Sequence, residues 1–565
     1  MATVKKVIVA VVYPTGYDKW GFPRRFKNGL FMPSYVLEVI KFLTEQGLSH
    51  ILSKDIEFET HAFNLQLARE ARAFRKLEES LAERNETVKV ILAMVGVMAY
   101  QLLFSIDTMR RWKKIGADCF VGGPAVNGGV AEMLEGVPKG SPCSGEIIDE
   151  LEFIQEQGFT LFAGDAYPQD PEKQSVWEGA LRDAIFDKPK SFYNGGWAPL
   201  ETAPIPPWRK HSGYIIDVIS IDQQSGCPYF ANGRGCIFCS IGSLSGKETR
   251  ERSAEQVIRY FKEILIGCPK TVQLFLLGDN GARAQNSISF LNRLIELKKD
   301  CKVPLSSLQV DTQVHKIPGF MELCEQANVG WVFVGVETPS AEGLKALKKV
   351  QNNPEEYKDF CDRMWQAGIN PMGSIMIGQE HHTPAVIIKE VDVLCEDGFT
   401  PLFTILTPSP GSPMNSTLRN KGKIMSLAEF NEADSSGVVA DHPLMSRQEL
   451  QEVYWIAWKR AYAFRYQVYR LRRLKSWSRW IVNLLMLVGF WRVGRERIHP
   501  LLSGNGKVFD FWDKKPESIP FSRYEIFKLK TGTKIKEIWL NLCTVPYFVF
   551  LVVVTAPIFR SFKKM

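Results

Sequence analysis

The sequence predicts an α/β protein with three parts: a doubly wound, Rossmann-like domain, a partial (β/α)6 TIM-type barrel, and a mostly helical, basic C-terminal region with a hydrophobic tail. Short β-branched runs alternate with amphipathic helical patterns in two separate stretches, which is typical of parallel sheets covered by helices. Beyond about residue 425 the β runs stop while helical patterns continue. A chain of 565 residues is too long for one core, so we expect about three domains.

The first domain is expected over residues 1–158. Two of its helical patterns end at a glycine, Gly47 and Gly116, as helices commonly do. Parallel sheets of this kind bind ligands at the carboxyl ends of their strands. Residues 159–212 are rich in proline and are expected to form a linker. The expected strands are 4–13, 55–63, 88–97 and 117–126, and the expected helices are 33–47 and 101–116.

The second domain is expected over residues 213–424, where the alternation returns. Six β runs separated by helical patterns fit a partial TIM-type barrel, whose active site lies on the loops that follow the strands. The expected strands are 215–221, 271–279, 307–314, 330–337, 371–380 and 401–410.

The C-terminal region, residues 425–565, is expected to be helical. A helix is predicted to begin at Ser446, an N-cap residue with Glu449 three positions later. From Lys459 to Arg479, basic residues are interleaved with aromatic residues and no acidic residue occurs. Such a segment fits contact with nucleic acid or with a membrane surface.

The segment 538–559 decides between these two partners in favour of the membrane. It is uncharged and flanked by basic residues, and its length can cross a bilayer of about 30 Å at about 1.5 Å per residue. Pro546 and Pro557 interrupt it, and the alternative is a hydrophobic tail buried on its own domain. We expect membrane association, a greasy substrate and no nucleic acid. The apolar run 480–491 is too short to span.

The N-terminal segment and the cysteines are expected to be those of a cytoplasmic protein. Hydrophobic residues make up 45% of the chain and charged residues 23%, which is ordinary for a globular protein with a net charge of +8. The N-terminal apolar run is short and ends in Tyr-Pro, so it is expected to be a first strand and turn rather than a signal peptide. The 11 cysteines are then expected to stay reduced or to bind metal.

Three cysteines, Cys227, Cys236 and Cys239, lie between a predicted strand and the rest of the barrel. Three thiolates can hold three irons of a cubane cluster and leave the fourth iron open to a ligand. The alternatives are zinc or redox thiols, but a structural zinc site requires four closed ligands and a second CxxC pair is absent from the sequence. The other cysteines of the barrel lie singly and are expected to be buried and free.

The order of several short motifs resembles radical S-adenosylmethionine (SAM) enzymes with an N-terminal cobalamin-binding domain. The resemblance covers about residues 5–413. Its motifs are Gly122-Gly123-Pro124 after a buried strand, Gly145-Glu146, a proline-rich stretch, the three cysteines, Gly278-Asp279, Gly335-Val336-Glu337, Gly373 to Gly378, and Thr407-Pro408-Ser409-Pro410-Gly411.

The cysteine motif departs from the family pattern. The family has CxxxCxxC, whereas this chain has eight residues between Cys227 and Cys236, so 231–235 is expected to be an insertion. Arg234-Gly235-Cys236 also mimics the start of the motif. We expect all three cysteines to be ligands and the loop to bulge.

The resemblance implies a 4Fe-4S cluster on these cysteines and SAM beside it. It implies SAM contacts for Phe238, inside the CxxC pair, and for Gly278, Asp279, Glu337, Gly373 and Gly378. A carboxylate at a strand end can meet the SAM ammonium, and glycine lets the backbone lie against adenine. The alternatives are a turn aspartate, a capping glutamate and a strand weakened by glycine.

The resemblance also implies cobalamin at the first domain. The expected contacts are Gly96, Val97, Met98, Gln101, Gly122, Gly123, Pro124, Gly145 and Glu146. No DxHxxG motif is found, and His61 is expected to be a structural histidine on a strand. The resemblance therefore implies cobalamin whose cobalt has no histidine ligand from the protein.

The implied function is cleavage of SAM to a 5′-deoxyadenosyl radical and C-methylation of an unactivated carbon in a lipid-like or secondary-metabolite substrate. The reductant is expected to be flavodoxin or ferredoxin. One alternative is a radical cyclase or rearrangement enzyme without net methyl transfer. A second is a methylthio-transferring RNA modifier, for which Cys119 and Cys143 are too few. A third is a membrane-bound metal-binding or sensor protein.

Overall fold

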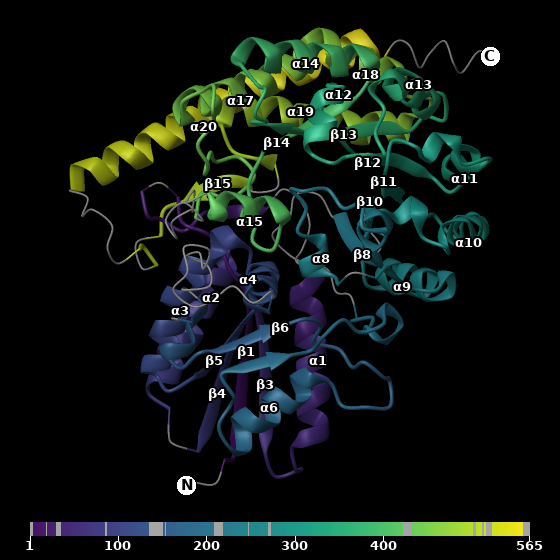
Figure 1. Cartoon of the computed structure of the whole chain (residues 1–565). Coiled ribbons are helices and arrows are strands. Elements are labelled where there is room, and N and C mark those ends of the chain that lie inside the picture. The colour runs from purple at the N-terminus through teal and green to yellow at the C-terminus, as the bar shows by residue number, and fades with distance from the viewer. Residues whose placement is uncertain are drawn as a thin grey trace.

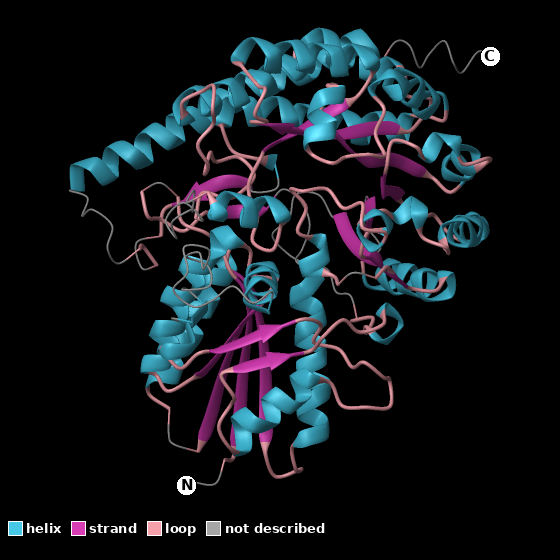
Figure 2. Cartoon of the chain, in the orientation of Figure 1, coloured by secondary structure: helices cyan, strands magenta, loops and turns pink. Residues whose placement is uncertain are grey.

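The computed structural model has an α/β domain at one end, a curved sheet with its helices beside it, and a layer of C-terminal helices across the other end (Figures 1 and 2). The structure describes residues 4–18, 20–29, 35–84, 87–134, 151–152, 154–207, 218–246, 248–268, 273–421, 431–500, 504–510, 513–515 and 523–556.

The N-terminal domain is a six-stranded parallel sheet in the order β3-β1-β4-β5-β6-β7. The order reverses direction at β1, so the carboxyl ends of β1 and β4 border a switch point where such sheets bind ligands. The strands are β1 (Lys6–Tyr13), β3 (Glu57–Asn64), β4 (Val88–Met94), β5 (Asp118–Gly122), β6 (Thr160–Ala163) and β7 (Phe192–Asn194). The helices are α1 (Tyr35–Ile51), α2 (Ala68–Ala82), α3 (Leu102–Lys114), α4 (Pro124–Leu134) and α6 (Val176–Phe186).

Both faces of this sheet are buried, because the apolar side chains of its strands pack into a separate hydrophobic core on each face. On β1, Ile8, Ala10 and Val12 join the cluster that contains Trp112, whereas Val7, Val9 and Val11 join the cluster that contains Trp177. Side chains alternate between the faces of a strand, so a continuous apolar run requires helices on both sides. This confirms the doubly wound prediction.

The linker expected over 159–212 differs from the structure. Residues 160–163 and 192–194 form β6 and β7 of the sheet, and α6 between them covers one face. The domain therefore continues to at least residue 194. The strands are only four and three residues long and lie among prolines and glycines, which explains why the sequence pattern favoured a linker.

The second domain contains six parallel strands, in the order β14-β13-β12-β11-β10-β8, with a short antiparallel strand β9 at the edge. This confirms the partial (β/α)6 barrel. The strands are β8 (Val218–Ser225), β9 (Arg250–Glu251), β10 (Gln273–Gly278), β11 (Leu305–Val310), β12 (Val329–Glu337), β13 (Asn370–Ile377) and β14 (Thr400–Ile405). The helices include α7 (Pro228–Ala231), α8 (Ile241–Leu244), α9 (Ala254–Gly267), α10 (Ser287–Asp300), α11 (Phe320–Gln326), α12 (Ala341–Ala346), α13 (Tyr357–Gln366), α14 (Pro384–Asp397) and α15 (Pro413–Asn420).

The C-terminal helices pack on the barrel and share its core. The buried cluster of the barrel continues into Trp458, Trp480 and Leu487, so this region is not an independent domain. The Ser446 hydroxyl and the Glu449 side chain form the expected capping box of the first helix. The elements are α17 (Arg447–Ala461), α18 (Phe464–Arg472), α19 (Trp477–Glu496), α20 (Arg523–Thr555), and β15 (Gly504–Val508), which pairs antiparallel with β2 (Arg25–Gly29).

Helix α17 covers the open edge of the barrel sheet. Tyr454 donates a hydrogen bond to the Phe403 carbonyl at 3.1 Å, and Tyr462 donates one to the Pro401 carbonyl at 2.5 Å. These carbonyls belong to β14, the edge strand, whose exposed backbone groups would otherwise invite pairing with another chain.

Several residues of the basic segment 459–479 hold this layer to the barrel. Arg470 is fully buried and donates to the Phe399 and Ala461 carbonyls, and Arg479 donates to the Gly368 carbonyl at 2.7 Å. Arg460 forms a bidentate ion pair with Asp392. These three arginines therefore serve the packing of the fold.

Candidate active site between the two α/β domains

The carboxyl edges of the two sheets face each other. Helix α4, which begins directly after β5, packs against α8 of the barrel. A Cβ at Gly128 on α4 would lie 2.5 Å from the Pro410 carbonyl oxygen, and one at Gly411 would lie 2.9 Å from Gly128 Cα. Glycine at both positions thus allows the backbones to approach closely. Ser243 on α8 donates a hydrogen bond to the Gly411 carbonyl at 2.6 Å, which links the first and last loops of the barrel.

The three cysteines of the motif lie together on the loop after β8. Cys236 is buried, and Cys227 and Cys239 are partly buried. Burial raises the pKa of all three thiols, that of Cys239 to about 12. Cys227 acts electrostatically on both Cys236 and Cys239, so the three thiols are near one another. Such thiols are weak nucleophiles when free, and a bound metal would deprotonate them.

Residues 228–235 fill the enlarged spacing with an ordered turn. Pro228 begins the short helix α7, and Phe230 packs against Gly235 and Gly242, where any side chain would collide with its ring. The Tyr229 hydroxyl donates to Asp311 Oδ2 at 3.1 Å, which fastens the turn to the end of β11. The expected bulge is therefore a packed feature of the site.

Asp311 is a site residue that the sequence did not indicate. Its carboxylate receives hydrogen bonds from Arg283 at 2.8 and 3.0 Å and from Asn280 at 3.0 Å, in addition to Tyr229. Although burial opposes it, these donors lower the pKa of Asp311. The network fixes the loops after β10 and β11 around the cysteine loop.

Asp279 lies where the sequence placed it, directly after β10, and it is bound to the cysteine loop. Its Oδ2 accepts a hydrogen bond from the Gly226 amide at 2.6 Å. Burial raises the pKa of Asp279 to about 6, and the Gly226 amide and Arg250 oppose the shift. A carboxylate in this position would gain from a cationic ligand group.

Glu337 ends β12 in a left-handed backbone conformation, with φ of 67°, and it is buried. Its Oε1 accepts a hydrogen bond from Lys349 Nζ at 2.8 Å, and its Oε2 has no hydrogen-bond partner among the described residues. A strained residue with an unsatisfied carboxylate oxygen is typical of a binding site. The free oxygen leaves room for the polar contact that the resemblance implies.

Lys349 is the second residue that the sequence did not indicate. Its ammonium lies 5.8 Å from the Phe238 ring centroid and is near enough to act on the pKa of Cys227, Cys236 and Cys239. Although burial opposes it, the Glu337 carboxylate and the cysteines raise the pKa of Lys349. The site thus contains a permanent positive charge beside the thiols.

Three of the glycines expected at the site lie on β10 and β13 or directly after them. Gly378 follows β13 with φ of 99°, which requires glycine, and a Cβ at Gly373 would press on Val336 at 3.1 Å. A Cβ at Gly278 would lie 3.2 Å from Gly281 Cα, so the turn before Asp279 is also tight. Gly278 and Gly378 thus lie at the carboxyl ends of β10 and β13, whereas Gly373 lies in the middle of β13.

The expected glycines of the N-terminal domain form a compact backbone loop. The Val97 amide donates to the Gly122 carbonyl at 3.1 Å, and the Ala125 amide donates to the Val97 carbonyl at 2.9 Å. A Cβ at Gly123, where φ is 136°, would lie 2.2 Å from the Val97 nitrogen. The loops after β4 and β5 are therefore locked together at the edge that faces the barrel.

Other expected cobalamin contacts differ in their accessibility. Met98 is 40% exposed, whereas Gln101 is buried and bonds to the Met98 amide and the Pro14 carbonyl, so its side chain supports the loop. Gly145 and Glu146 lie outside the described residues. His61, expected to be structural, lies near Glu59 at 3.2 Å on the edge strand β3.

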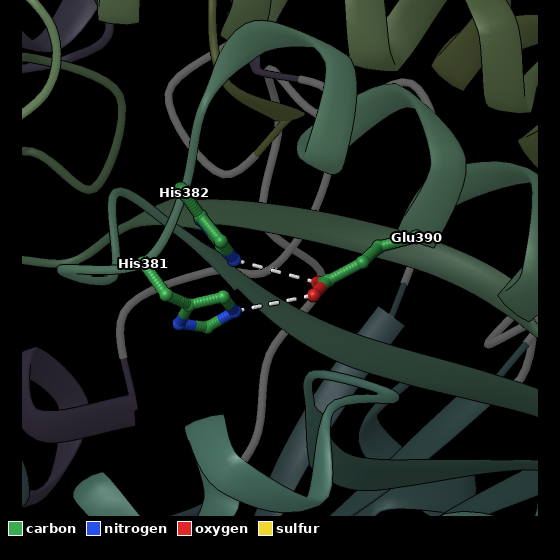
Figure 3. Close-up of side chains that lie close together, drawn as sticks. All are labelled: His381, His382 and Glu390. Carbon is green, nitrogen blue, oxygen red and sulfur yellow. Dashed lines mark hydrogen bonds and ion pairs between the residues drawn. The ribbon is translucent and has the colours of Figure 1, made fainter.

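Two histidines and a glutamate converge beside Gly378 (Figure 3). Glu390 on α14 lies 3.3 Å from His381 Nε2 and 3.4 Å from His382 Nε2, and it accepts a hydrogen bond from Thr338. His382 Nδ1 accepts the amides of Gly378 and Gln379 at 3.1 and 3.2 Å.

That pattern decides the tautomer of His382. A ring nitrogen that accepts two amides carries no proton, so Nε2 carries it and points to Glu390. A metal-bound histidine instead donates from its second nitrogen. The cluster is therefore better explained as a hydrogen-bonded brace for the loop after β13 than as a metal site. Burial lowers the pKa of His382, which keeps it neutral.

Comparison with known proteins identifies the barrel. Residues 224–394 match the family model described as the Radical SAM superfamily. The chain is 28% identical over 229 residues to the hopanoid C-2 methylase of Rhodopseudomonas palustris, covering 39% of this chain and 42% of that protein. It is 24% identical over 270 residues to the bacteriochlorophyllide d C-8(2)-methyltransferase of Chlorobaculum tepidum, covering 45% and 58%. The matched segments span about half the length of these relatives.

The fold is similar to a solved structure of the cobalamin-dependent S-adenosylmethionine radical enzyme OxsB. The TM-score is 0.50 at 12% identity, and the match covers 99% of this chain and 81% of that one. At this identity the similarity concerns the fold. It includes both α/β domains and the C-terminal layer, whereas the family model covers the barrel alone. Residues 224–394 of this chain are therefore a radical SAM domain, preceded by a doubly wound α/β domain and followed by a helical layer.

Proposed function

We propose that this chain is a cobalamin-dependent radical SAM enzyme that C-methylates an unactivated carbon of a lipid-like or secondary-metabolite substrate. One observation carries the proposal: a group of three cysteines on the barrel lies at the same domain boundary as a glycine-lined loop of the N-terminal sheet. The relatives named as methylases and methyltransferases support the type of reaction.

The barrel side would hold the cluster and SAM. Cys227, Cys236 and Cys239 would bind three irons of a 4Fe-4S cluster, which supplies the electron that cleaves the SAM sulfonium to a 5′-deoxyadenosyl radical. Asp279 would accept hydrogen bonds from the ammonium of SAM, and the free oxygen of Glu337 would make a further polar contact. The backbone near Gly373 and Gly378 would lie against adenine.

The N-terminal side would hold cobalamin, which supplies the methyl carrier. The loops after β4 and β5 offer backbone and glycine rather than charged side chains, since the segments 95–101 and 122–127 contain no charged residue. A bulky and largely neutral ligand can approach such a surface closely. None of the residues expected to contact cobalamin is a histidine, so the proposal includes no histidine on cobalt.

Two observations support a hydrophobic substrate. Both relatives named above act, by their names, on large hydrophobic molecules, a hopanoid and a bacteriochlorophyllide. This chain in addition carries a C-terminal helix that is apolar enough to meet a membrane. We therefore propose a greasy substrate, a location at the inner face of the membrane, and a flavodoxin or ferredoxin as electron donor. The alternative, a cyclase or rearrangement enzyme, would use the same site without net methyl transfer.

Anaerobic reconstitution tests the proposal. The protein should bind about four irons per chain and produce 5′-deoxyadenosine from SAM under reducing conditions. Cys236→Ala should abolish this activity, whereas Cys301→Ala, which removes a partly buried cysteine outside the motif, should retain it. Retained cleavage in Cys236→Ala would exclude this cysteine as a ligand.

Product analysis separates methyl transfer from the alternative. Net methyl transfer consumes two SAM molecules and releases S-adenosylhomocysteine together with 5′-deoxyadenosine, whereas cyclisation releases no S-adenosylhomocysteine. Lipid profiling of a deletion strain against its parent should then show the loss of one methylated, hydrophobic product. An unchanged lipid profile would contradict the substrate class but not the chemistry.

A further inference from the structure

Helix α20 is apolar on both of its faces. The most apolar 18-residue window of its segment Lys530–Thr555 has a mean hydropathy of 2.0, yet only 17% of that window is buried. Of the large hydrophobic side chains that are exposed in the described chain, eight lie on this helix at spacings of three and four residues. They are Ile535, Ile538, Trp539, Leu542, Val545, Val549, Phe550 and Val553, which we call the outer stripe.

The opposite face of α20 is packed on the protein. Tyr547 stacks on Trp491 of α19 with ring centroids 4.4 Å apart and meets the ring of Phe464 on α18 edge to face at 6.4 Å. Phe550, at the border of the outer stripe, contacts the same Phe464 ring at 4.8 Å. Leu540 and Leu551 on this side are buried. A helix packed on one face normally exposes a polar face to water, so the outer stripe requires another partner.

The charges of α20 are confined to its first half. Arg523, Lys528, Lys530, Lys534 and Lys536 outnumber Glu525 and Glu537, and no charged residue follows before Thr555. Trp539, 57% exposed, lies at the junction between the basic and the apolar halves. Basic residues attract anionic headgroups, and tryptophan prefers the boundary between headgroups and acyl chains.

The composition of the outer stripe favours lipid over protein as its partner. Six of its eight members are valine, isoleucine or leucine, and only two are aromatic. Aromatic residues and arginine anchor protein interfaces, whereas leucine and valine are under-represented among their anchors. Figure 1 shows α20 along the outside of the helical layer, with its basic end projecting past the rest of the molecule.

We propose that α20 docks this protein on the surface of an anionic bilayer, with the helix lying in the membrane plane and the outer stripe in the acyl boundary. The packed face argues against a spanning helix. Crossing the bilayer would separate Tyr547 from Trp491 and break the hydrogen bond from Arg492 to Asn541 at 2.8 Å. A helix that docks in the membrane plane keeps these contacts and buries only the side chains of the outer stripe, which are exposed in the structure.

Vesicle flotation of the full-length protein tests the docking surface. The protein should float with phosphatidylcholine vesicles that contain phosphatidylglycerol, and bind phosphatidylcholine alone more weakly. The variant Leu542→Glu/Val549→Glu should lose at least about tenfold in vesicle affinity, because it places two charges in the outer stripe. Ile266→Glu on α9, at a position 76% exposed and far along the chain, is the matched control and should bind as the wild type does.

Carbonate extraction of vesicle-bound protein tests the orientation of the helix. An in-plane helix should be released, and a fraction that resists extraction would overturn the in-plane assignment in favour of a spanning helix. Failure of the wild type to float, or equal flotation of the double variant, would overturn the docking surface. Dimers in solution that the double variant abolishes, without vesicle binding, would assign the outer stripe to a second copy. None of these assays uses SAM or substrate, so their failure is distinct from failure of the proposed chemistry.

Discussion

The two edges that face each other at the domain boundary are chemically opposite. The barrel edge contains three thiols, the buried ion pair of Lys349 and Glu337, and the carboxylates of Asp279 and Asp311. The edge of the N-terminal sheet contains backbone groups and glycines. The barrel edge therefore offers charged side chains that suit a small charged ligand, whereas the sheet edge offers a largely uncharged backbone surface that a bulky ligand could approach closely.

The largest effect is expected from filling the glycine loop. Gly123→Ala would place a Cβ 2.2 Å from the Val97 nitrogen, so the loop must move and cobalamin binding should be abolished. Gly179→Ala on α6 is the control, because nothing lies within 4 Å of its Cβ. Absorbance of bound cobalamin after gel filtration measures the result. Iron content and SAM cleavage should persist in Gly123→Ala. If they are lost together with cobalamin binding, the two edges do not bind their ligands independently.

Asp279→Asn removes the carboxylate on the barrel edge. A charge-assisted hydrogen bond contributes about 1.5–3 kcal/mol, so SAM affinity should fall by roughly 10- to 100-fold, as measured by equilibrium dialysis. Asp300→Asn, at the exposed end of α10, is the control and should bind normally. Because the pKa of Asp279 is raised to about 6, SAM affinity of the wild type should also weaken as the pH falls below 6. Unchanged affinity in Asp279→Asn would remove this residue from the SAM site.

Lys349→Met/Glu337→Gln replaces the buried ion pair by neutral groups. A positive charge favours the reduced cluster and a negative charge opposes it, so the two losses partly cancel. Lys349 acts on the pKa of all three thiols, whereas Glu337 acts on that of Cys236, so the loss of the positive charge should dominate. The midpoint potential should therefore fall, by less than the roughly 100 mV expected for a single charge at an effective dielectric constant near 20. Removing both charges avoids leaving one buried and unpaired, which would destabilise the fold. Redox titration followed by electron paramagnetic resonance measures the shift. The control Lys316→Met/Glu356→Gln removes an exposed pair and should leave the potential unchanged.

The last prediction concerns stability at low pH, at a residue away from both edges. Burial lowers the pKa of His499 to about 4, so the unfolded chain takes up this proton first as the pH falls. The stabilisation from a neutral His499 is present above pH 6.5 and is lost as the pH approaches 4, by about 3 kcal/mol in all. His499→Gln should flatten the dependence of urea unfolding on pH in this range. If the pH dependence of unfolding is the same in His499→Gln as in the wild type, His499 is not the source of the stability loss at low pH.

The sequence predicted the barrel edge better than the sheet edge. The cysteines and Asp279 follow strands with clear apolar patterns, so their neighbourhood could be expected from chain order. Lys349 lies in a lysine-rich turn that looks like surface, and only the fold of the turn after α12 brings its ammonium to Glu337, 12 residues earlier in the chain. Strands β6 and β7 are too short to give a periodic signal.

The basic segment 459–479 shows the same limit. Its arginines and aromatic residues fit a binding surface in the sequence, yet Arg470 and Arg479 are buried against barrel carbonyls. A sequence pattern shows which residues are charged, but it does not show that carbonyl groups of the same chain accept their hydrogen bonds. The apolar segment of α20 shows the opposite situation. Its length and composition are evident from the sequence, but only the structure shows which of its side chains pack on the protein and which are exposed.

The most direct measurement is electron paramagnetic resonance of the reduced, reconstituted protein with and without SAM labelled with ¹⁷O in its carboxylate. If three cysteines leave one iron open to SAM, the cluster signal should change on addition of SAM and show coupling to the label. A signal that is indifferent to SAM, or a loop that holds zinc alone after oxygen-free purification, would contradict the account.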